Sequence, residues 1–177
     1  MSLTDDQLPV PAAVSGPAVS SGPTVSSGPT LVGDGLRYVH LCPLRWADMD
    51  SFGHVNNVVY LRYLEQARVE WMFTTAKLAG VAEFSLGTVV AQHEIPYKRP
   101  LVYRAEPVRV ETWVTRISHS SFTVAYEVKD EHWVYAVAET VLVPYDLDAE
   151  RPRRITAEER DYLTPYLAAA PPKSRFR

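Results

Sequence analysis

The stretch VVYLRYLEQARVEWMFTTAKLAG, residues 58–80, predicts the element around which the rest of the chain folds. It contains no proline, and its only glycine is the last residue, Gly80, a natural helix C-cap. Polar residues recur every three or four positions, at 62, 66, 70, 74 and 77, and so form one stripe of a helix. Most other positions are apolar or aromatic, so we expect a long helix that the protein encloses on most sides.

Beyond this helix the period of the sequence changes to two, which is typical of β-strands. The expected strand segments are 37–46 before the helix and 87–101 (interrupted by Pro96), 107–119, 121–130 and 132–146 after it. The connections at 118–121 and 129–132 are short and predict antiparallel hairpins. A sheet with one apolar face can wrap a single helix, so the order predicts an α+β hot-dog fold: an antiparallel five-stranded sheet around one long helix.

Three parts of the chain differ in composition. Residues 1–35 repeat a Ser-Gly-Pro unit at 15–17, 21–23 and 27–29 and contain no aromatic residue. Such a segment cannot bury enough surface to offset its ordering entropy, and we expect a disordered tail. Residues 36–167 form the predicted hot-dog domain, which ends in a short helix after the capping-box pair Thr156 and Glu159. Residues 168–177 are expected to be a C-terminal tail.

The bulk composition excludes several function classes. The chain has 177 residues and a net charge of −3, which gives no general reason to expect nucleic-acid or membrane binding. Its single cysteine, Cys42, cannot form an intrachain disulfide, and no apolar run approaches the roughly 20 residues of a membrane helix. The N-terminus does not have the pattern of a secretory signal, so we expect a cytoplasmic protein. The histidines lack metal-ligand spacing, and neither a metal nor another cofactor is predicted.

Candidate catalytic groups stand directly before the long helix, in DMDSFGHVNN, residues 48–57. Attack on an acyl thioester needs a base or nucleophile and donors for the developing oxyanion. A helix N-terminus supplies free N–H groups, and an aspartate just upstream could activate water or attack directly. We expect the helix to start at 56–58, so Asp50 and the helix end would meet both needs within one segment.

The same residues also have plain structural explanations. Asp50 could close an Asx-turn or cap the helix, and His54 could be a partly buried histidine bonded to backbone. Asn56 or Asn57 could be the helix N-cap, a role that excludes no other. Glu65 could make a surface ion pair within the helix, or it could face a cleft. The residues alone leave these alternatives open.

The segment DMDSFGHVNNVVYLRYLEQAR, residues 48–68, resembles the signature of hot-dog acyl-CoA thioesterases of the 4-hydroxybenzoyl-CoA thioesterase family. The likeness is dense over residues 45–71 and looser to about 145 and in DLDAERPRRITAEERDYL, residues 146–163. It implies that Asp50 is a nucleophile or general base and that the backbone amide of Asn57 polarises the thioester carbonyl. His54 and Asn56 would shape the site.

The resemblance also implies a substrate and an assembly. We expect hydrolysis of a fatty-acyl or aryl CoA thioester to the free acid and CoA, in a homodimer or homotetramer that joins two sheets. Acyl-CoA would lie at the subunit interface. The remaining candidate substrate contacts are Tyr60, Lys98, Arg99 and Arg104.

Two departures from related families keep alternatives open. Plant-type acyl-carrier-protein thioesterases carry an asparagine two positions after the aspartate and a carboxylate on a later strand. Phe52 occupies the first position here and Pro100 falls near the second, which weakens an acyl-carrier-protein substrate. Another hot-dog branch uses a glutamate on the helix, for which Glu65 is the candidate. A non-catalytic acyl-CoA or lipid-binding protein on this fold is the alternative function.

Overall fold

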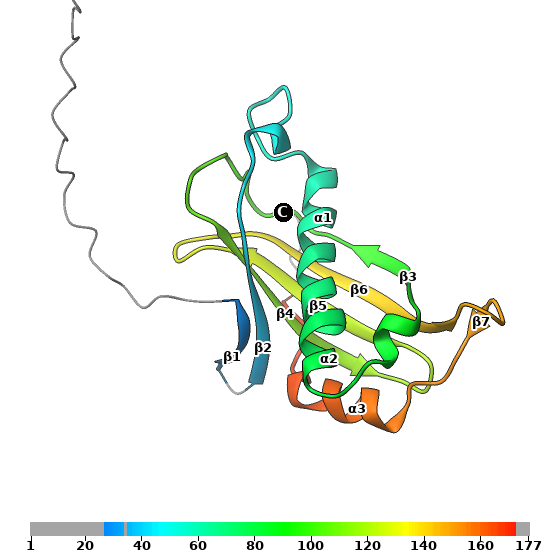
Figure 1. Cartoon of the computed structure of the whole chain (residues 1–177). Coiled ribbons are helices and arrows are strands. Elements are labelled where there is room, and N and C mark those ends of the chain that lie inside the picture. Colours follow the sequence, from blue (N-terminus) through cyan, green and yellow to red (C-terminus); the bar gives the residue numbers. More distant parts are fainter. Residues whose placement is uncertain (1–26, 34, 173–177) are drawn as a thin grey trace, which may run out of the picture.

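The computed structural model describes residues 27–33 and 35–172, and one long helix lies against a face of an antiparallel sheet (Figure 1). This helix comprises α1 (Asn57–Val69), the π-helical turn η2 (Glu70–Thr75) and α2 (Ala76–Leu78). It begins within the predicted range and ends before Gly80, which has a φ of 88°. Both predicted helix limits are therefore confirmed.

The sheet has the strand order β1-β2-β4-β5-β6-β3, with β7 paired to β6, and every strand pair is antiparallel. The strands are β1 (Gly28–Val32), β2 (Gly35–Cys42), β3 (Thr88–Glu94), β4 (Val108–Ile117), β5 (Phe122–Lys129), β6 (Val134–Asp146) and β7 (Arg151–Pro152). The smaller helical elements are η1 (Trp46–Asp48), η3 (Glu83–Leu86), α3 (Ala157–Leu163) and η4 (Thr164–Tyr166). The two predicted hairpins, β4–β5 and β5–β6, are confirmed, and so is the capped helix α3.

The core lies between the long helix and the sheet. Leu64, Ala67 and Trp71 of the helix are at most 1% exposed and pack in one cluster with Val114 and Tyr126 of the sheet. Fully burying one large apolar side chain contributes about 1.5–3 kcal/mol. Packing of this kind, rather than intrinsic helix propensity, therefore supplies most of the stability of the helix.

Some boundaries near the N-terminal end differ from the prediction. Residues 28–32, placed in the disordered tail 1–35, form β1, because Gly33 at φ 58° turns the chain back onto the edge of β2. The sheet thus has β1 and β7 in addition to the five expected strands; residues 1–26 of the predicted tail lie outside the described residues. The first expected strand, 37–46, runs instead from 35 to 42, because Pro43 has no N–H for the ladder.

The C-terminal end also differs, since residues 168–172 of the predicted tail pack on the sheet. The N–H of Ala168 donates to the Val114 carbonyl over 2.9 Å. The indole of Trp113, on the sheet face opposite the long helix, donates to the Ala169 carbonyl over 2.9 Å. These bonds fasten the segment across the outer face of β4. Within the described residues, no helix is long and apolar enough to cross a membrane.

Candidate functional site

The loop before α1 folds around the carboxylate of Asp50. Oδ1 of Asp50 accepts hydrogen bonds from the backbone N–H groups of Phe52, over 2.8 Å, and His54, over 3.2 Å. Gly53 has a φ of 77°, a left-handed conformation that favours glycine, and its N–H donates to the Asp50 carbonyl. The Asx-turn, one of the alternatives that the sequence left open for Asp50, is therefore present. Oδ2 of Asp50 has no hydrogen-bond partner among residues 27–33 and 35–172, so this oxygen can contact a ligand or water.

Buried hydrogen bonds hold this loop against the rest of the domain. The N–H of Val55 donates to the Leu101 carbonyl over 2.8 Å, and the N–H of Asn56 donates to the Asp48 carbonyl over 2.9 Å. The Asp48 carboxylate is itself buried and accepts a 2.7 Å hydrogen bond from the Tyr63 hydroxyl. Asp48 is thus a structural residue, and its contacts fix the place of Asp50 relative to the helix.

The N-terminus of α1 keeps one free donor. Asn56 is the N-cap, and its side-chain oxygen accepts from the N–H of Val58 over 3.1 Å. Its carbonyl accepts from the N–H of Val59 over 2.9 Å. The N–H of Asn57, the first helical residue, has no acceptor in the described part of the chain. The positive end of the helix dipole adds to this donor, so the position suits an oxyanion.

A pocket of about 360 Å³ brings these groups together. It is lined by Asp50, Val55, Asn57, Tyr60, Tyr97, Lys98, Arg99 and Pro100. Five of these residues were candidates from the sequence: Asp50, Asn57, Tyr60, Lys98 and Arg99. Residues more than 40 positions apart in the chain meet here, because the segment after β3 returns to the start of α1.

Tyr97 is a pocket residue that the sequence did not reveal. Its hydroxyl donates to the Asn57 carbonyl over 3.0 Å, and its ring meets the Tyr60 ring edge-on at 5.2 Å. Tyr97 follows Pro96, which ends the strand, and that break was the only sequence signal for a side chain turned out of the sheet. Burial raises the pKa of Tyr60 to about 12 and also raises that of Tyr97, so both hydroxyls stay protonated at neutral pH.

Two cations complete the pocket. Lys98 and Arg99 have no ion-pair partner in the part of the chain that the structure describes, whereas Arg37 and Arg104 each pair with a carboxylate. The guanidinium of Arg99 lies over the ring of Trp133, 3.7 Å from its centroid. These charges are thus available to an anionic ligand.

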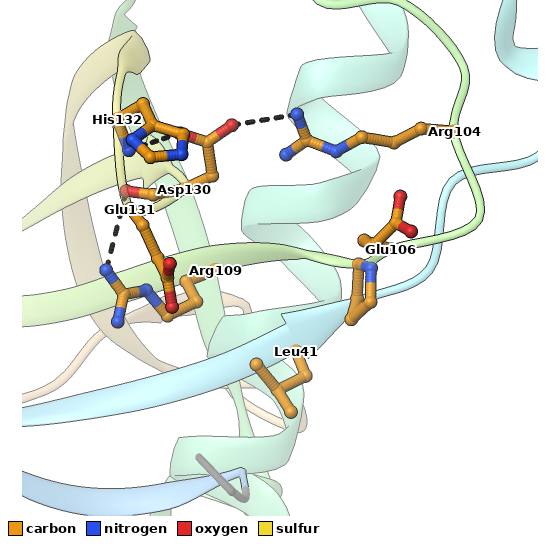
Figure 2. A pocket seen from close by; sticks show the side chains of 8 residues that line it. Leu41, Arg104, Glu106, Arg109, Asp130, Glu131 and His132 are labelled. Carbon is orange, nitrogen blue, oxygen red and sulfur yellow. Dashed lines mark hydrogen bonds and ion pairs between the residues drawn. The ribbon is translucent and has the colours of Figure 1, made fainter. Parts of the chain in front are cut away.

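Four candidate residues lie outside this pocket. His54 and Asn56 contribute to the loop and the helix cap but do not line the cavity. Arg104 faces a separate pocket of about 560 Å³, where it pairs with Asp130 at 2.8 Å, as Figure 2 shows. Glu65 is exposed and lines a groove of about 590 Å³ between α1 and β2. Of the two carboxylates proposed for catalysis, only Asp50 shares a pocket with Asn57.

Two other reactive side chains, Cys42 and His40, are shielded or occupied. Burial, with a further effect of the Asp48 charge, raises the pKa of Cys42 to about 12, so its thiol stays protonated. His40 is buried, and its Nδ1 lies 2.8 Å from the Glu70 carboxylate. Over the described ranges, no group of three or more His, Cys, Asp or Glu residues is placed to hold a metal ion.

Comparison with known proteins follows this geometry. A family model of the thioesterase-like superfamily matches residues 44–171. A candidate thioesterase from Pseudomonas aeruginosa is 32% identical, with 70% of this chain and 95% of that chain covered and a TM-score of 0.61. A candidate acyl-CoA thioesterase from Xanthomonas campestris is 41% identical, with 62% of this chain and 92% of that chain covered and a TM-score of 0.53. A thioesterase from Thermus thermophilus, solved with coenzyme A and zinc, is 27% identical, with 71% and 90% covered and a TM-score of 0.60. A search of curated protein sequences finds no significant match.

The matched region contains the whole candidate pocket, from the Asp50 loop through α1 to the segment after β3. The likeness read from residues 48–68 is therefore confirmed at the level of the superfamily, and the hot-dog fold with it. The 4-hydroxybenzoyl-CoA branch within it stays a prediction. With the fold, the pocket and a match over most of its length in agreement, the chain belongs to the thioesterase-like superfamily.

Proposed function

We propose that this protein is an acyl-CoA thioesterase that hydrolyses a fatty-acyl or aryl CoA thioester to the free acid and CoA. One observation carries the proposal: a single pocket contains the Asp50 carboxylate, with its free Oδ2, and the start of α1, with the free N–H of Asn57. The superfamily match and the structure of a Thermus thermophilus relative with coenzyme A support it.

The proposed reaction uses both groups on one carbonyl. The thioester oxygen accepts the Asn57 N–H, so that charge developing on this oxygen is stabilised by the donor and by the helix dipole. Asp50 either takes a proton from an attacking water or attacks the carbonyl carbon itself to form an anhydride that water then opens. In both routes the C–S bond breaks and one water is consumed. The hydroxyl of this water becomes part of the free acid, and its other proton goes to the sulfur, which leaves as the CoA thiol.

The remaining pocket residues fit the rest of the ligand. Lys98 and Arg99 carry unpaired positive charge that suits the phosphates of CoA. Tyr60 and Tyr97 offer ring surface and neutral hydroxyls beside the thioester. Such rings accept aliphatic and aromatic acyl groups alike, so the acyl class is left to a substrate panel.

We further propose a homodimer in which two sheets join through β3. This strand is last in the sheet order, and its outer edge has no strand partner among the described residues. Val89 and Val90 on it are about 40% exposed. An apolar edge strand is a ready surface for pairing, and joining two copies would place the pocket near the subunit interface. A homotetramer would add a second kind of contact to this dimer.

A non-catalytic acyl-CoA-binding protein is the second candidate, and a specific observation favours it. Oδ1 of Asp50 already accepts two backbone hydrogen bonds in the loop, so a structural role alone would explain this residue. In that case CoA esters would bind without turnover.

The test is release of CoA thiol from a panel of acyl-CoAs, from short to long chains and including an aryl-CoA. Asp50→Asn keeps an oxygen that can accept from Phe52 and His54 but removes the ionised carboxylate. We expect it to lower turnover by about 10²–10⁴-fold. Glu65→Gln makes the same chemical change in the other candidate carboxylate, which lies outside the pocket, and should leave turnover unchanged; a loss in this variant instead would assign catalysis to Glu65. Unchanged turnover in Asp50→Asn would contradict the mechanism, and binding without turnover in the wild type would favour the second candidate.

A further inference from the structure

We infer that Trp133 is the docking surface for the adenine ring of CoA. Its indole is 50% exposed, and the Arg99 guanidinium stacks on the ring at 3.7 Å from the centroid. Arg99 also lines the candidate pocket, so Trp133 lies one side chain beyond the pocket wall. The inference rests on the proposed function, because it concerns the nucleotide end of the proposed ligand.

The turn that carries Trp133 is held firmly at its backbone. Oδ1 of Asp130 accepts from the N–H groups of His132, over 2.8 Å, and Trp133, over 2.7 Å. The N–H of Asp130 in turn donates to the Trp133 carbonyl over 2.9 Å. Both backbone polar groups of Trp133 are therefore bonded, and the indole is presented to solvent from a fixed turn. A fixed aromatic surface loses little conformational freedom when a ligand stacks on it.

One residue, Tyr135, joins this turn to the pocket. Its carbonyl accepts from the N–H groups of Lys98, over 2.7 Å, and Arg99, over 3.2 Å. Its hydroxyl donates to Oδ2 of Asp130 over 2.5 Å. The two pocket cations and the Trp133 turn are thus parts of one hydrogen-bonded unit.

Arg104 braces this unit instead of presenting a free charge. Its Nη1 lies 2.8 Å from Oδ2 of Asp130 and 3.0 Å from the Tyr135 hydroxyl. Figure 2 shows the guanidinium directed at the Asp130 carboxylate across the second pocket. The pair cancels its own charge, so the positive charge beside the catalytic groups comes from Lys98 and Arg99, which line the candidate pocket and have no ion-pair partner among the described residues.

The order of these groups matches the order of groups in CoA. From the thioester, CoA continues through pantetheine to a diphosphate and then to adenosine. The protein places the catalytic groups in the pocket, two unpaired cations on its wall, and an exposed indole next to the second cation. A purine can stack on an indole or on a guanidinium plane, so the Arg99–Trp133 pair offers adenine a surface while Arg99 stays near the phosphates.

Acyl-CoA compared with the acyl-pantetheine of the same acyl group tests this role, because only the first carries adenine. For Trp133→Ala we expect KM for acyl-CoA to rise about tenfold with kcat unchanged and with both constants for acyl-pantetheine unchanged. Trp133→Phe should recover part of the loss. The matched control is Trp46→Ala, since Trp46 is 75% exposed, packs edge-on against Tyr103 and lies outside the pocket. Equal effects of Trp133→Ala on both substrates, or no effect on either, would overturn the inference.

Direct binding separates this inference from the proposed function. CoA and pantetheine are titrated by calorimetry into the wild type and into Trp133→Ala, with melting temperatures as a check of folding. If Trp133→Ala binds CoA tenfold more weakly than the wild type does, while the two bind pantetheine equally well, the adenine site is supported even if no thioester is hydrolysed. Equal CoA affinity of wild type and variant, or no CoA binding by the wild type, overturns it.

Discussion

The hydroxyl of Tyr97 donates to the backbone carbonyl of Asn57 over 3.0 Å, and so ties the segment after β3 to the first residue of α1. This bond connects the two parts of the chain that form the candidate pocket. It also fixes the ring of Tyr97 beside that of Tyr60. The helix end that we propose as the oxyanion site is thus positioned by a long-range contact as well as by its own cap.

Tyr97→Phe removes this bond and keeps the ring. We expect kcat/KM for the best acyl-CoA to fall about 3–10-fold, because one neutral hydrogen bond contributes about 0.5–1.5 kcal/mol. The melting temperature should change little, since Tyr97 is partly exposed. Steady-state kinetics and thermal unfolding measure the two effects. Unchanged kinetics would show that the bond does not position the site.

Asn56→Ala removes the side-chain acceptor that caps α1. We expect the free energy of unfolding to fall by about 1 kcal/mol, the usual cost of losing an N-cap. Asn56→Asp keeps an acceptor oxygen at the same place, and its free energy of unfolding should stay within a few tenths of a kcal/mol of the wild-type value. Urea unfolding followed by circular dichroism distinguishes the two variants, and equal stability of both would contradict the capping role.

The Asp130 carboxylate predicts an acid-sensitive contribution to stability. Burial acts to raise its pKa, but hydrogen bonds from Tyr135, from the backbone of His132 and Trp133 and from Arg104 together hold the pKa well below the ordinary 3.8. Because the folded-state pKa is lowered, the contribution is present above about pH 4 and is lost as the pH falls below it.

Asp130→Asn should therefore lower the free energy of unfolding by about 1.5–3 kcal/mol at pH 7, since charged hydrogen bonds are lost. Between pH 7 and pH 3 the difference from the wild type should shrink by about 1 kcal/mol, because the unfolded wild-type carboxyl takes up its proton first. Urea unfolding at both pH values measures this, with exposed Glu131→Gln as the control. A difference independent of pH would mean that the charge of Asp130 does not stabilise the turn.

Val90→Asp places a charge on the exposed edge strand β3. If two copies pair along this strand, the variant brings like charges together across the dimer interface. We expect the dissociation constant of the dimer to rise at least tenfold. Light scattering after size-exclusion chromatography gives the mass of each form. Leu78→Asp, an exposed apolar residue on α2, is the matched control; the same mass for Val90→Asp as for the wild type would place the interface elsewhere.

Sequence pattern predicted most of the architecture because its signals are local. The stripe at 62, 66, 70, 74 and 77 and the terminal Gly80 predicted a helix whose limits the structure reproduces. The motif before it left open an Asx-turn at Asp50 and a cap at Asn56 or Asn57, and the structure has the turn and a cap at Asn56. These features depend on contacts within a few residues, so adjacent sequence suffices to predict them.

Such local patterns did not predict the contacts between segments that are distant in the sequence. Arg104 was grouped with Lys98 and Arg99 as a candidate substrate contact, yet it lies in a different pocket because Asp130, 26 positions away, binds its guanidinium. Tyr97 was overlooked because its role depends on a carbonyl 40 positions earlier. The strand β1 was overlooked because its residues pair with the edge of β2 and have little apolar signal of their own.

By itself the sequence determined the hot-dog class, the extent of the long helix and the identity of the catalytic candidates at its start. Tertiary structure alone decided which side chains share the pocket with Asp50, which cations remain unpaired and where the exposed indole of Trp133 lies. The physical reason is that helices, caps and turns form through bonds between neighbours in sequence, whereas a pocket forms from whichever distant segments the packed sheet and helix bring within bonding distance.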